Sequence, residues 1–498
     1  SVSFRLALTQ RNLATLDALA VNVSTPSSPS YGQYLSPAAV AAVVRPDPLH
    51  LAAVAGFLNA AGASWSWSAP CMDFAYASMG RTAAEAAFGV KFVMVEHERA
   101  PGRAFPRALE QYDIPAELSG AVRAVDGVTL EAGPDAPPRR RTFQAEPGVT
   151  VTPTTLHKQY GIPTSSPSAS KASMAVAEFE QAYFYPNDLA AFQKQYGFAD
   201  KALTKIVGKN KPDTGYLGEC SLDVEYITTV ASGVSTWMFS LSQFDLVAWG
   251  ASLWPQSVAN QTDAPLVHSI SWGSPENGFD PETLASVNTE FKKLATMGFT
   301  VLVASGDQGT GHSGLFRCGT FLPNFPASSP WVTAVGGTYI GTDGTETGWL
   351  FSGGGFSDTF AAPSYQAQAI TTYKAQPGLP SQTYWNSSGR AIPDVSAAST
   401  NFEVLIQGEL GPISGTSAAT PTFAGVLAYI NGERLAAGKP ALGFVNPLLY
   451  TAGSGFTDIV AGNNKSPPCD TGFPATKGFD AITGLGTPVY TQLAAALA

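Results

Sequence analysis

Charge is scarce in this chain, because Asp, Glu, Lys and Arg together make up only 13% of its 498 residues. The formal net charge is −10, which has the wrong sign for binding a phosphate backbone. The one basic run, Arg139 to Arg141, lies among prolines rather than aromatic residues, so we do not expect nucleic acid as a partner. Apolar residues make up 44% of the sequence, which is typical of a compact globular protein.

Long apolar runs are absent as well. No stretch reaches the roughly 18 apolar residues that a membrane-spanning helix requires, so we expect no membrane partner. The first residues, SVSFRLALTQ, lack the layout of a signal peptide, and we interpret the chain as already trimmed.

Cysteine is rare, which excludes a disulfide scaffold, and the absence of C-x-x-C spacing argues against a zinc site. One or two disulfides remain open. The four cysteines are Cys71, Cys220, Cys318 and Cys469. Four N-x-S/T sequons favour an exported glycoprotein, although such tripeptides are common by chance. The sequons begin at Asn22, Asn260, Asn386 and Asn464.

Three segments differ in their sequence patterns. Residues 1–130 alternate short strand-like runs with Ala/Leu-rich helical segments, which predicts a small α+β domain. Residues 131–147 combine Pro, Gly and charge without periodicity, which predicts an exposed linker; its tribasic run favours a processing site over a plain tether. From residue 148 onward, apolar runs such as VHSISWG and FTVLVAS alternate with helical stretches, as in a parallel α/β sheet. Functional residues are expected directly after these strands, at the carboxyl edge of the sheet.

The strongest short motif is SGTSAATPTFAGVLAYI at 414–430, where a Gly/Ser/Thr turn leads into an apolar helical pattern. Ser417 is placed at the predicted helix start, where free N–H groups and the helix dipole favour negative charge developing on an attacked carbonyl. Pro421 is expected in the first turn of this helix. A lone G-T-S is more often a helix N-cap, but the full G-T-S-A-x-x-P run resembles the nucleophile turn of the subtilase superfamily.

A serine nucleophile needs a base, and an ordinary subtilase supplies a histidine from an H-G-T helix and an aspartate from D-T-G. This chain contains Asp213-Thr214-Gly215, but none of its five histidines precedes Gly-Thr, and His312 lies in a glycine loop. We therefore interpret Asp213 as unrelated to catalysis. A Ser-His-Asp enzyme that uses Asp213 and is active at neutral pH is the rival hypothesis.

Carboxylates take the place of the missing histidine. Glu219 and Asp223 are four residues apart in a helical pattern, so they share one helix face, where a close pair tends to share a proton. The alternative is a solvated acidic face, although Leu222 and Tyr226 favour burial. Asp307 follows a predicted buried strand in VLVASGDQGTG, where a turn role is the alternative. When protonated, it can donate a hydrogen bond to an oxyanion, which a carboxylate anion cannot do.

The order E-x-x-x-D, then S-G-D, then G-T-S-A-x-x-P resembles the sedolisin family of serine-carboxyl peptidases. SSPSYGQYLSPAAVAAVVRP in the first domain is similar to the family's propeptide, and SGGGFS, FPASSPWVTAVGGT and GRAIPDVSA are similar to its catalytic domain. The resemblance implies an α/β, subtilisin-like parallel-sheet catalytic domain at 148–498. It also implies that the α+β domain at 1–130 is a ferredoxin-like propeptide.

The resemblance assigns four catalytic residues and one structural Ca²⁺. The catalytic residues are Ser417 as nucleophile, Glu219 as general base and later acid, Asp223 as the residue that orients Glu219, and Asp307 as oxyanion donor. The Ca²⁺ site lies near the C-terminus in FTDIV and TKGFDAITGLGTP, where oxygen ligands suit a hard cation. Its expected ligands are the side chains of Asp458 and Asp480 and the backbone carbonyls of Ile459, Thr476 and Gly478. A disulfide between Cys318 and Cys469 is implied as well, whereas Cys71 lacks a propeptide partner.

We therefore predict a zymogen with its own propeptide as intramolecular inhibitor and peptides or unfolded proteins as substrates. Its linker is removed autocatalytically at low pH in a lysosomal or extracellular, acidic and oxidising compartment. The catalytic domain is expected to release tripeptides from free N-termini. Tripeptide-releasing relatives carry adjacent acids after the VHSISWG run, whereas this chain has Ser274 and Pro275, then Glu276, so an endopeptidase of the same family is the nearest alternative. A catalytically silent binding module of the same fold is the alternative from another class.

Overall fold

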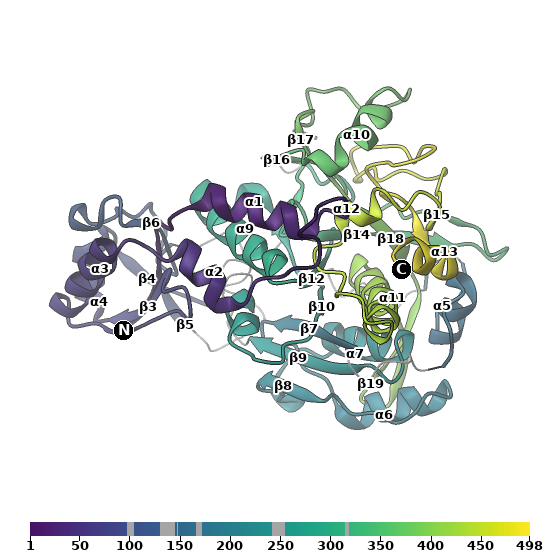
Figure 1. The fold of residues 1–498 in the computed structure, drawn as a ribbon, viewed down its shortest axis with the longest axis horizontal. Helices are drawn as coiled ribbons and strands as arrows, with labels where there is room; N and C mark the ends of the chain where they lie inside the picture. The colour runs from purple at the N-terminus through teal and green to yellow at the C-terminus, as the bar shows by residue number, and fades with distance from the viewer. Residues whose placement is uncertain (97–103, 130–144, 147, 166–171, 242–253, 314–317) are drawn as a thin grey trace.

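The structure is a computed structural model of residues 1–498 (Figure 1). It describes the whole chain except 97–103, 130–144, 147, 166–171, 242–253 and 314–317. A smaller N-terminal domain lies against one side of a larger α/β domain. The predicted linker at 131–147 falls outside the described residues apart from 145 and 146.

The N-terminal domain is built on a four-stranded antiparallel sheet in the order β2-β3-β1-β6. Its elements are β1 (Val2–Leu8), α1 (Leu13–Ser24), α2 (Pro37–Val44), α3 (Pro48–Ala60), β2 (Ser64–Trp67), β3 (Phe74–Met79), α4 (Arg81–Phe88) and β6 (Val122–Asp126), with a separate hairpin of β4 (Phe92–Glu96) and β5 (Ala104–Ala108). Apolar side chains of β1, α3 and α4 form one core, including Phe4, Leu58 and Phe88. This β-α-β-β-α-β order is ferredoxin-like, as predicted.

The larger domain is built on an eight-stranded sheet in the order β15-β14-β12-β10-β7-β9-β8, with β18 pairing β14. The strands are β7 (Ser173–Phe179), β8 (Lys205–Gly208), β9 (Ser235–Leu241), β10 (Val267–Ile270), β12 (Thr300–Ala304), β14 (Thr333–Ile340), β15 (Glu346–Gly348) and β18 (Val395–Ala398). All pairs are parallel except β14 with β15. Because helices cover both faces, the central strands are buried nearly throughout, and the predicted parallel α/β sheet is confirmed.

Two buried helices pack together beside the sheet, α7 (Gly218–Val230) and α11 (Thr416–Ala436). They approach closely because α11 carries Gly425, where a Cβ would lie 2.7 Å from a side-chain carbon of Val230. The first turns of α7 and α11 meet the ends of β10 and β12 around one pocket. The fold therefore brings the segments with the predicted catalytic residues to the carboxyl edge of the sheet.

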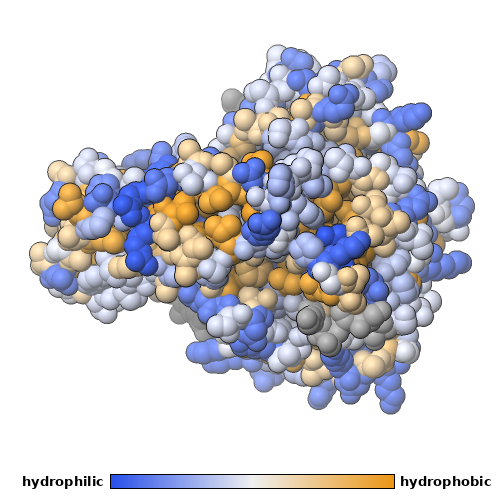
Figure 2. All heavy atoms as spheres, in the orientation of Figure 1, coloured by the Kyte–Doolittle hydropathy of each residue, from blue (hydrophilic) through white to orange (hydrophobic). Residues whose placement is uncertain are grey.

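Helix α9 (Pro281–Thr296) of the larger domain packs against α1 and β6 of the N-terminal domain (Figure 1). Hydrophobic residues gather on the visible surface over the N-terminal domain and at its junction with the larger domain (Figure 2). Over the described ranges, no single helix is long and apolar enough to cross a membrane, although α2 and α3 pass that test as a bent pair.

Candidate active site

Ser417 is the second residue of α11, which begins after Gly415, and it is 6% exposed. Its Oγ lies 3.5 Å from the carbonyl oxygen of Ser271, which follows β10. Pro421 is the sixth residue of the helix, so its predicted place in the first turn was wrong. Proline has no N–H to donate to the Ser417 carbonyl, and the Ser271 hydroxyl lies 3.3 Å from that carbonyl.

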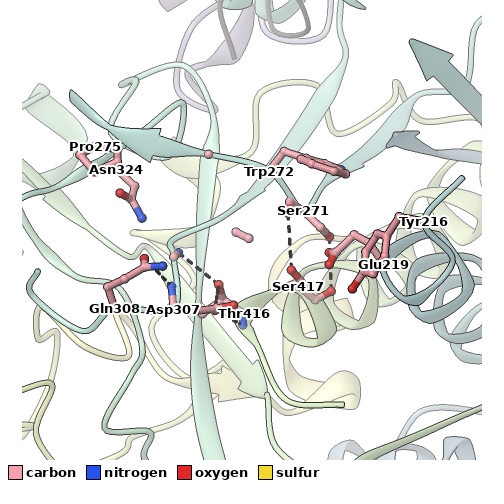
Figure 3. Close-up of a pocket in the computed structure, with 13 residues that line it drawn as sticks. Tyr216, Glu219, Ser271, Trp272, Pro275, Asp307, Gln308, Asn324, Thr416 and Ser417 are labelled. Carbon is pink, nitrogen blue, oxygen red and sulfur yellow. Dashed lines mark hydrogen bonds between the residues drawn. The ribbon is translucent and has the colours of Figure 1, made fainter. Parts of the chain in front are cut away.

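Ser417 lines an open pocket of about 610 Å³ at the carboxyl edge of the sheet (Figure 3). The lining residues are Tyr216, Glu219, Ser271, Trp272, Gly273, Pro275, Ala304, Gly306, Asp307, Gln308, Asn324, Thr416 and Ser417. Glu219 lies beside Ser417 in this pocket, and the Ser417 hydroxyl points to the Ser271 carbonyl. Three of the four predicted catalytic side chains, Ser417, Glu219 and Asp307, are therefore brought together, and the fourth, Asp223, lies behind them.

The carboxylates of α7 are buried, with Glu219 6% and Asp223 0% exposed, so the alternative of a solvated acidic face was wrong. The hydroxyl of Ser271 lies 3.0 and 2.8 Å from the two carboxyl oxygens of Asp223 and donates to them. Burial raises the pKa of Asp223 well above its usual range, and the neighbouring carboxyls of Glu178 and Glu219 raise it further. Asp223 therefore favours its protonated form.

Glu178, near the end of β7, is a buried carboxyl group that the sequence reasoning missed. Burial raises the pKa of Glu178 well above its usual range, and the charge of Glu219 raises it further. The neighbouring polar groups of Trp272 and Cys220 act in the opposite direction. The signal in the sequence was a glutamate inside the otherwise apolar strand SMAVAEF. Three adjoining buried carboxyl groups cannot all ionise at little cost, so this cluster holds protons that exposed carboxylates release.

Asp307 follows β12 and reaches the N-terminus of α11. Its Oδ1 accepts hydrogen bonds from the backbone N–H of Thr416 at 2.7 Å and from the Thr416 hydroxyl at 2.9 Å. The Thr416 hydroxyl accepts in turn from the N–H of Gly306 at 3.1 Å. A Cβ on Gly415 would lie 2.8 Å from Oδ2, so glycine leaves room for the second carboxyl oxygen. The carboxyl of Asp307 is thus fixed between the start of α11 and the pocket that it lines.

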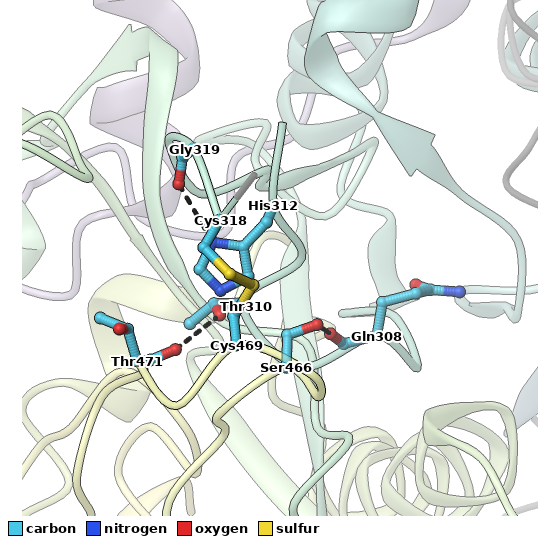
Figure 4. Close-up of a disulfide and its surroundings, with 8 residues drawn as sticks. All are labelled: Gln308, Thr310, His312, Cys318, Gly319, Ser466, Cys469 and Thr471. Carbon is cyan, nitrogen blue, oxygen red and sulfur yellow. Dashed lines mark hydrogen bonds between the residues drawn. A yellow bond between two sulfur atoms is a disulfide. The ribbon is translucent and has the colours of Figure 1, made fainter. Parts of the chain in front are cut away.

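Asp213 lies away from the pocket on an exposed turn, η2 (Pro212–Thr214), where it accepts a hydrogen bond from the Tyr185 hydroxyl at 2.7 Å. Nδ1 of His312 lies 3.0 Å from the carbonyl oxygen of Gly319 (Figure 4). No histidine is among the residues that line the pocket, and His97 falls outside the described ranges. The described residues therefore contain no Ser-His-Asp arrangement at Ser417.

Cys318 and Cys469 form a disulfide, as the resemblance implies (Figure 4). The bond joins the loop that follows Asp307 to a C-terminal loop, and the hydroxyl of Ser466 in that loop donates to the Gln308 carbonyl at 2.7 Å. The C-terminal loop therefore braces the loop that carries Asp307. Cys71 and Cys220 are free and buried.

The four sequons differ in their exposure. Asn22 and Asn260 are exposed and Asn386 is partly buried, whereas Asn464 is 0% exposed. The side-chain amide of Asn464 donates to the Ala481 carbonyl at 3.2 Å, and its oxygen accepts a backbone N–H at 2.9 Å. The folded chain therefore excludes a glycan at Asn464 and leaves the other three sites open.

The expected calcium ligands lie around one loop near the C-terminus. Asp480 is 0% exposed and accepts the N–H of Thr476 at 3.1 Å, and Asp458 accepts the N–H of Gly478 at 2.9 Å. The loop that carries Thr476 and Gly478 therefore contacts the carboxyl groups of both Asp480 and Asp458. Ile459, which follows Asp458, is buried. The hydroxyl of Thr476 is buried without a hydrogen-bond partner in the described part of the chain. Two carboxylates, an orphaned hydroxyl and backbone carbonyls are oxygen donors that fit Ca²⁺, which would have no role in the reaction itself.

Known proteins match both domains of the chain. The model of the pro-kumamolisin activation domain matches residues 1–130, and that of the subtilase family matches residues 254–441. Tripeptidyl-peptidase 1 of Canis lupus familiaris is 37% identical over 526 residues, covering 100% of this chain and 91% of that protein. Tripeptidyl-peptidase 1 of Homo sapiens is 37% identical over 520 residues, covering 99% and 91%. The chain belongs to the sedolisin family.

Two solved structures share the fold of this sedolisin-family chain. Pseudomonas sedolisin, a serine-carboxyl proteinase, has a TM-score of 0.56 and 24% identity, covering 71% of this chain and 98% of that one. The epidermin leader peptide processing serine protease from Staphylococcus aureus has a TM-score of 0.51 and 13% identity, covering 99% and 98%. At these identities the likeness shows the fold alone. With its relatives, the chain is a serine peptidase of the sedolisin type that carries an N-terminal activation domain.

Proposed function

We propose that this protein is an acid-active serine-carboxyl peptidase, made as a zymogen, that releases tripeptides from the free N-termini of peptides and unfolded proteins. The observation that carries the proposal is that Ser417, Glu219 and Asp307 line one pocket, with buried carboxyl groups behind them. The relatives named tripeptidyl-peptidase 1 support tripeptide release. The disulfide supports an oxidising compartment, which we take to be the lysosome or the cell exterior.

In the proposed mechanism, Glu219 takes the proton of Ser417 Oγ as that oxygen attacks the substrate carbonyl. Glu219 then passes the proton to the leaving amine, and afterwards it activates the water that hydrolyses the acyl-enzyme. Asp223, held by the Ser271 hydroxyl, orients Glu219. A protonated Asp307 donates to the oxyanion next to the positive end of α11, and one such donor is worth about 2.7–4 kcal/mol of transition-state stabilisation.

Activity is expected to increase as the pH falls from neutral, until Glu219, the general base, becomes protonated. Burial raises the pKa of Asp223 and of Glu178, so the cluster keeps its protons at pH values where exposed carboxylates are ionised. The cluster binds these protons in acid and releases them as the pH rises. The site then loses the protonation state that catalysis requires. Above the governing pKa, we expect kcat/KM to fall by about tenfold per pH unit. Steady-state kinetics on a peptide with a free N-terminus, from about pH 3 to pH 8, measures this profile.

The same peptide with a blocked N-terminus separates the alternatives. Cleavage of the free peptide alone supports tripeptide release, whereas equal cleavage of both peptides indicates an endopeptidase. An optimum at neutral pH would favour a Ser-His-Asp subtilase. A chain that is folded but inactive at every pH would be a silent binding module.

We also propose that the loop around Asp458 and Asp480 binds one Ca²⁺ that stabilises the C-terminal segment. Chelation is expected to lower the melting temperature, and Ca²⁺ at about 100 times its Kd should restore about 2.7 kcal/mol. Asp480→Asn should abolish this Ca²⁺ dependence in differential scanning calorimetry. Asp470→Asn, at a side chain that is 90% exposed, should retain it. A melting temperature of the unmodified protein that is unchanged by chelator and by added Ca²⁺ would refute the site.

A further inference from the structure

The active-site pocket has two ends of different chemistry (Figure 3). Glu219 and Tyr216 lie at one end, whereas Asn324, Pro275 and Gln308 lie at the other. In the proposed mechanism, Glu219 protonates the leaving amine, so the leaving-group residue must lie at the Glu219 end. The opposite end then receives the side chain on the acyl side of the cleaved bond, which is the P1 residue.

Asn324 presents a carboxamide at this P1 end. It begins β13 (Asn324–Phe325) and pairs with Pro275 in β11 (Ser274–Pro275). Its Nδ2 donates to the Ser305 carbonyl at 3.3 Å, and a Cβ on Gly306 would lie only 1.9 Å from that nitrogen. Glycine at 306 therefore makes room for the amide. With Nδ2 engaged, Oδ1 remains as an acceptor that no described residue bonds.

Gln308 presents a second carboxamide beside it. Its Oε1 accepts the N–H of Asp307 at 3.2 Å, and its backbone carbonyl accepts the Ser466 hydroxyl at 2.7 Å. The Cys318–Cys469 disulfide ties the same two loops together (Figure 4). With Oε1 engaged and the backbone braced, Nε2 remains as a donor at the pocket, and nothing in the described ranges accepts from it.

Fixed charge is missing from this end of the pocket. Apart from Asp307, whose carboxyl binds the start of α11, no described residue that lines the P1 end is charged. Glu276, directly after Pro275, is turned away and 4% exposed. Its carboxyl accepts the Ser357 hydroxyl at 2.5 Å and the N–H of Asp358 at 2.9 Å. A charged P1 side chain would therefore lose its water here without gaining a counter-ion.

We propose that Asn324 and Gln308 form a neutral carboxamide pair that selects a glutamine or asparagine side chain at P1. The Asn324 Oδ1 accepts an N–H of the substrate amide, and the Gln308 Nε2 donates to its oxygen. A site built for such hydrogen bonds discriminates against an analogue that lacks them, because its own polar groups are then left unpaired. This inference rests on the proposed peptidase activity and adds its substrate class.

The test is a series of free-N-terminus peptides that differ only at P1, carrying Gln, Met, Lys or Glu. It is run at about pH 5, where an aspartate side chain is largely ionised. For the unmodified protein, we expect kcat/KM for Gln to exceed that for Met and Lys by about tenfold or more. Asn324→Asp introduces a negative charge and hardly changes the shape of the side chain. The ratio of kcat/KM for the Lys peptide to kcat/KM for the Gln peptide should therefore rise by at least about tenfold. Gln308→Glu should act in the same direction, and Gln195→Glu, on an exposed residue of α6 (Pro186–Gln195), should not.

Each remaining outcome has one meaning. A flat P1 profile, or one that neither pocket variant changes, overturns the carboxamide pair while leaving the peptidase activity intact. In a second series of peptides that differ only at P1′, a preference that the pocket variants change there instead of at P1 overturns the placement of the acyl side. Inactivity of the unmodified protein on every peptide refutes the proposed function itself. Gln308→Glu carries the test if thermal unfolding shows that Asn324→Asp does not fold.

Discussion

Replacing Glu219 by glutamine is expected to lower kcat by on the order of 10⁴- to 10⁶-fold, with little change in KM. Glutamine keeps the size of the side chain and one acceptor oxygen, but it cannot take the proton of Ser417 or return it to the leaving amine. Because Glu219 is buried among other carboxyl groups, removing its charge should not destabilise the fold. Steady-state kinetics near pH 4 and thermal unfolding measure the two effects separately.

Asp213→Asn is the matched control for this prediction. Asp213 is the aspartate of a D-T-G motif, yet it lies on an exposed turn outside the pocket and contacts the Tyr185 hydroxyl. Its replacement should leave kcat within about twofold, as expected for a surface substitution. The reverse pattern, with Asp213→Asn inactive and Glu219→Gln active, would contradict the carboxylate mechanism and revive the Ser-His-Asp alternative.

The residues that the sequence predicted share one property, which is that each follows a strong local pattern. Ser417 opens an apolar helix after a glycine turn, and Asp307 follows a buried strand, so each is placed at the carboxyl edge by its own neighbours in sequence. The parallel sheet and the α+β character of the N-terminal domain likewise follow from apolar periodicity, whereas the subtilisin-like and ferredoxin-like topologies were implied by the family resemblance. Local pattern was therefore sufficient for the α/β and α+β classes of the two domains and for three candidate catalytic side chains that line one pocket.

The predictions that failed depend on contacts between distant segments. Glu178 was missed because its importance comes from the packing of α7 beside the end of β7, which no local pattern shows. Pro421 lies deeper in its helix than predicted because α11 already begins at Thr416, and the Ser271 hydroxyl, far away in sequence, lies 3.3 Å from the carbonyl that proline leaves without a backbone donor. The sequon at Asn464 is ruled out by burial alone.

The contact between the two domains buries a cluster of charges. Lys293 on α9 lies 2.5 Å from Asp73 of the N-terminal domain and 2.5 Å from Glu290, and all three side chains are at most 5% exposed. Gln10 donates to Asp73 at 2.7 Å and lies 3.5 Å from Glu290. The pKa of Lys293 is raised, because Asp73 and Glu290 outweigh the opposing effect of its burial. The lysine is therefore charged at every physiological pH and is the cation that both carboxylates require.

Glu290 gives this contact a pH dependence of its own. Burial raises the pKa of Glu290 to about 7; Lys293 and, more weakly, Arg5 oppose this increase, and Asp73 adds to it. Protonation of Glu290 therefore adds to the free energy of docking. This stabilisation is fully present below the pKa of an ordinary glutamate, about 4.3, and it is lost as the pH rises through the raised pKa of about 7. Protonation of Glu290 thus holds the domains together in acid. We expect the carboxyl groups that trigger acid release of the propeptide to be others.

Replacing Lys293 by methionine is expected to release the propeptide at a higher pH and faster than in the unmodified zymogen. The change leaves Asp73, and above about pH 7 also Glu290, buried without a cation, and an unpaired buried charge costs about 3–5 kcal/mol. Docking should weaken by about two to four orders of magnitude, since each 1.36 kcal/mol is a factor of ten. Time courses of zymogen processing on gels, at stepwise lower pH, measure the shift.

The control is Lys292→Met, because that lysine pairs across the same interface with the half-exposed Asp17, and such a pair contributes only about 0–1 kcal/mol. Equal processing of both variants would show that the buried cluster does not hold the two domains together.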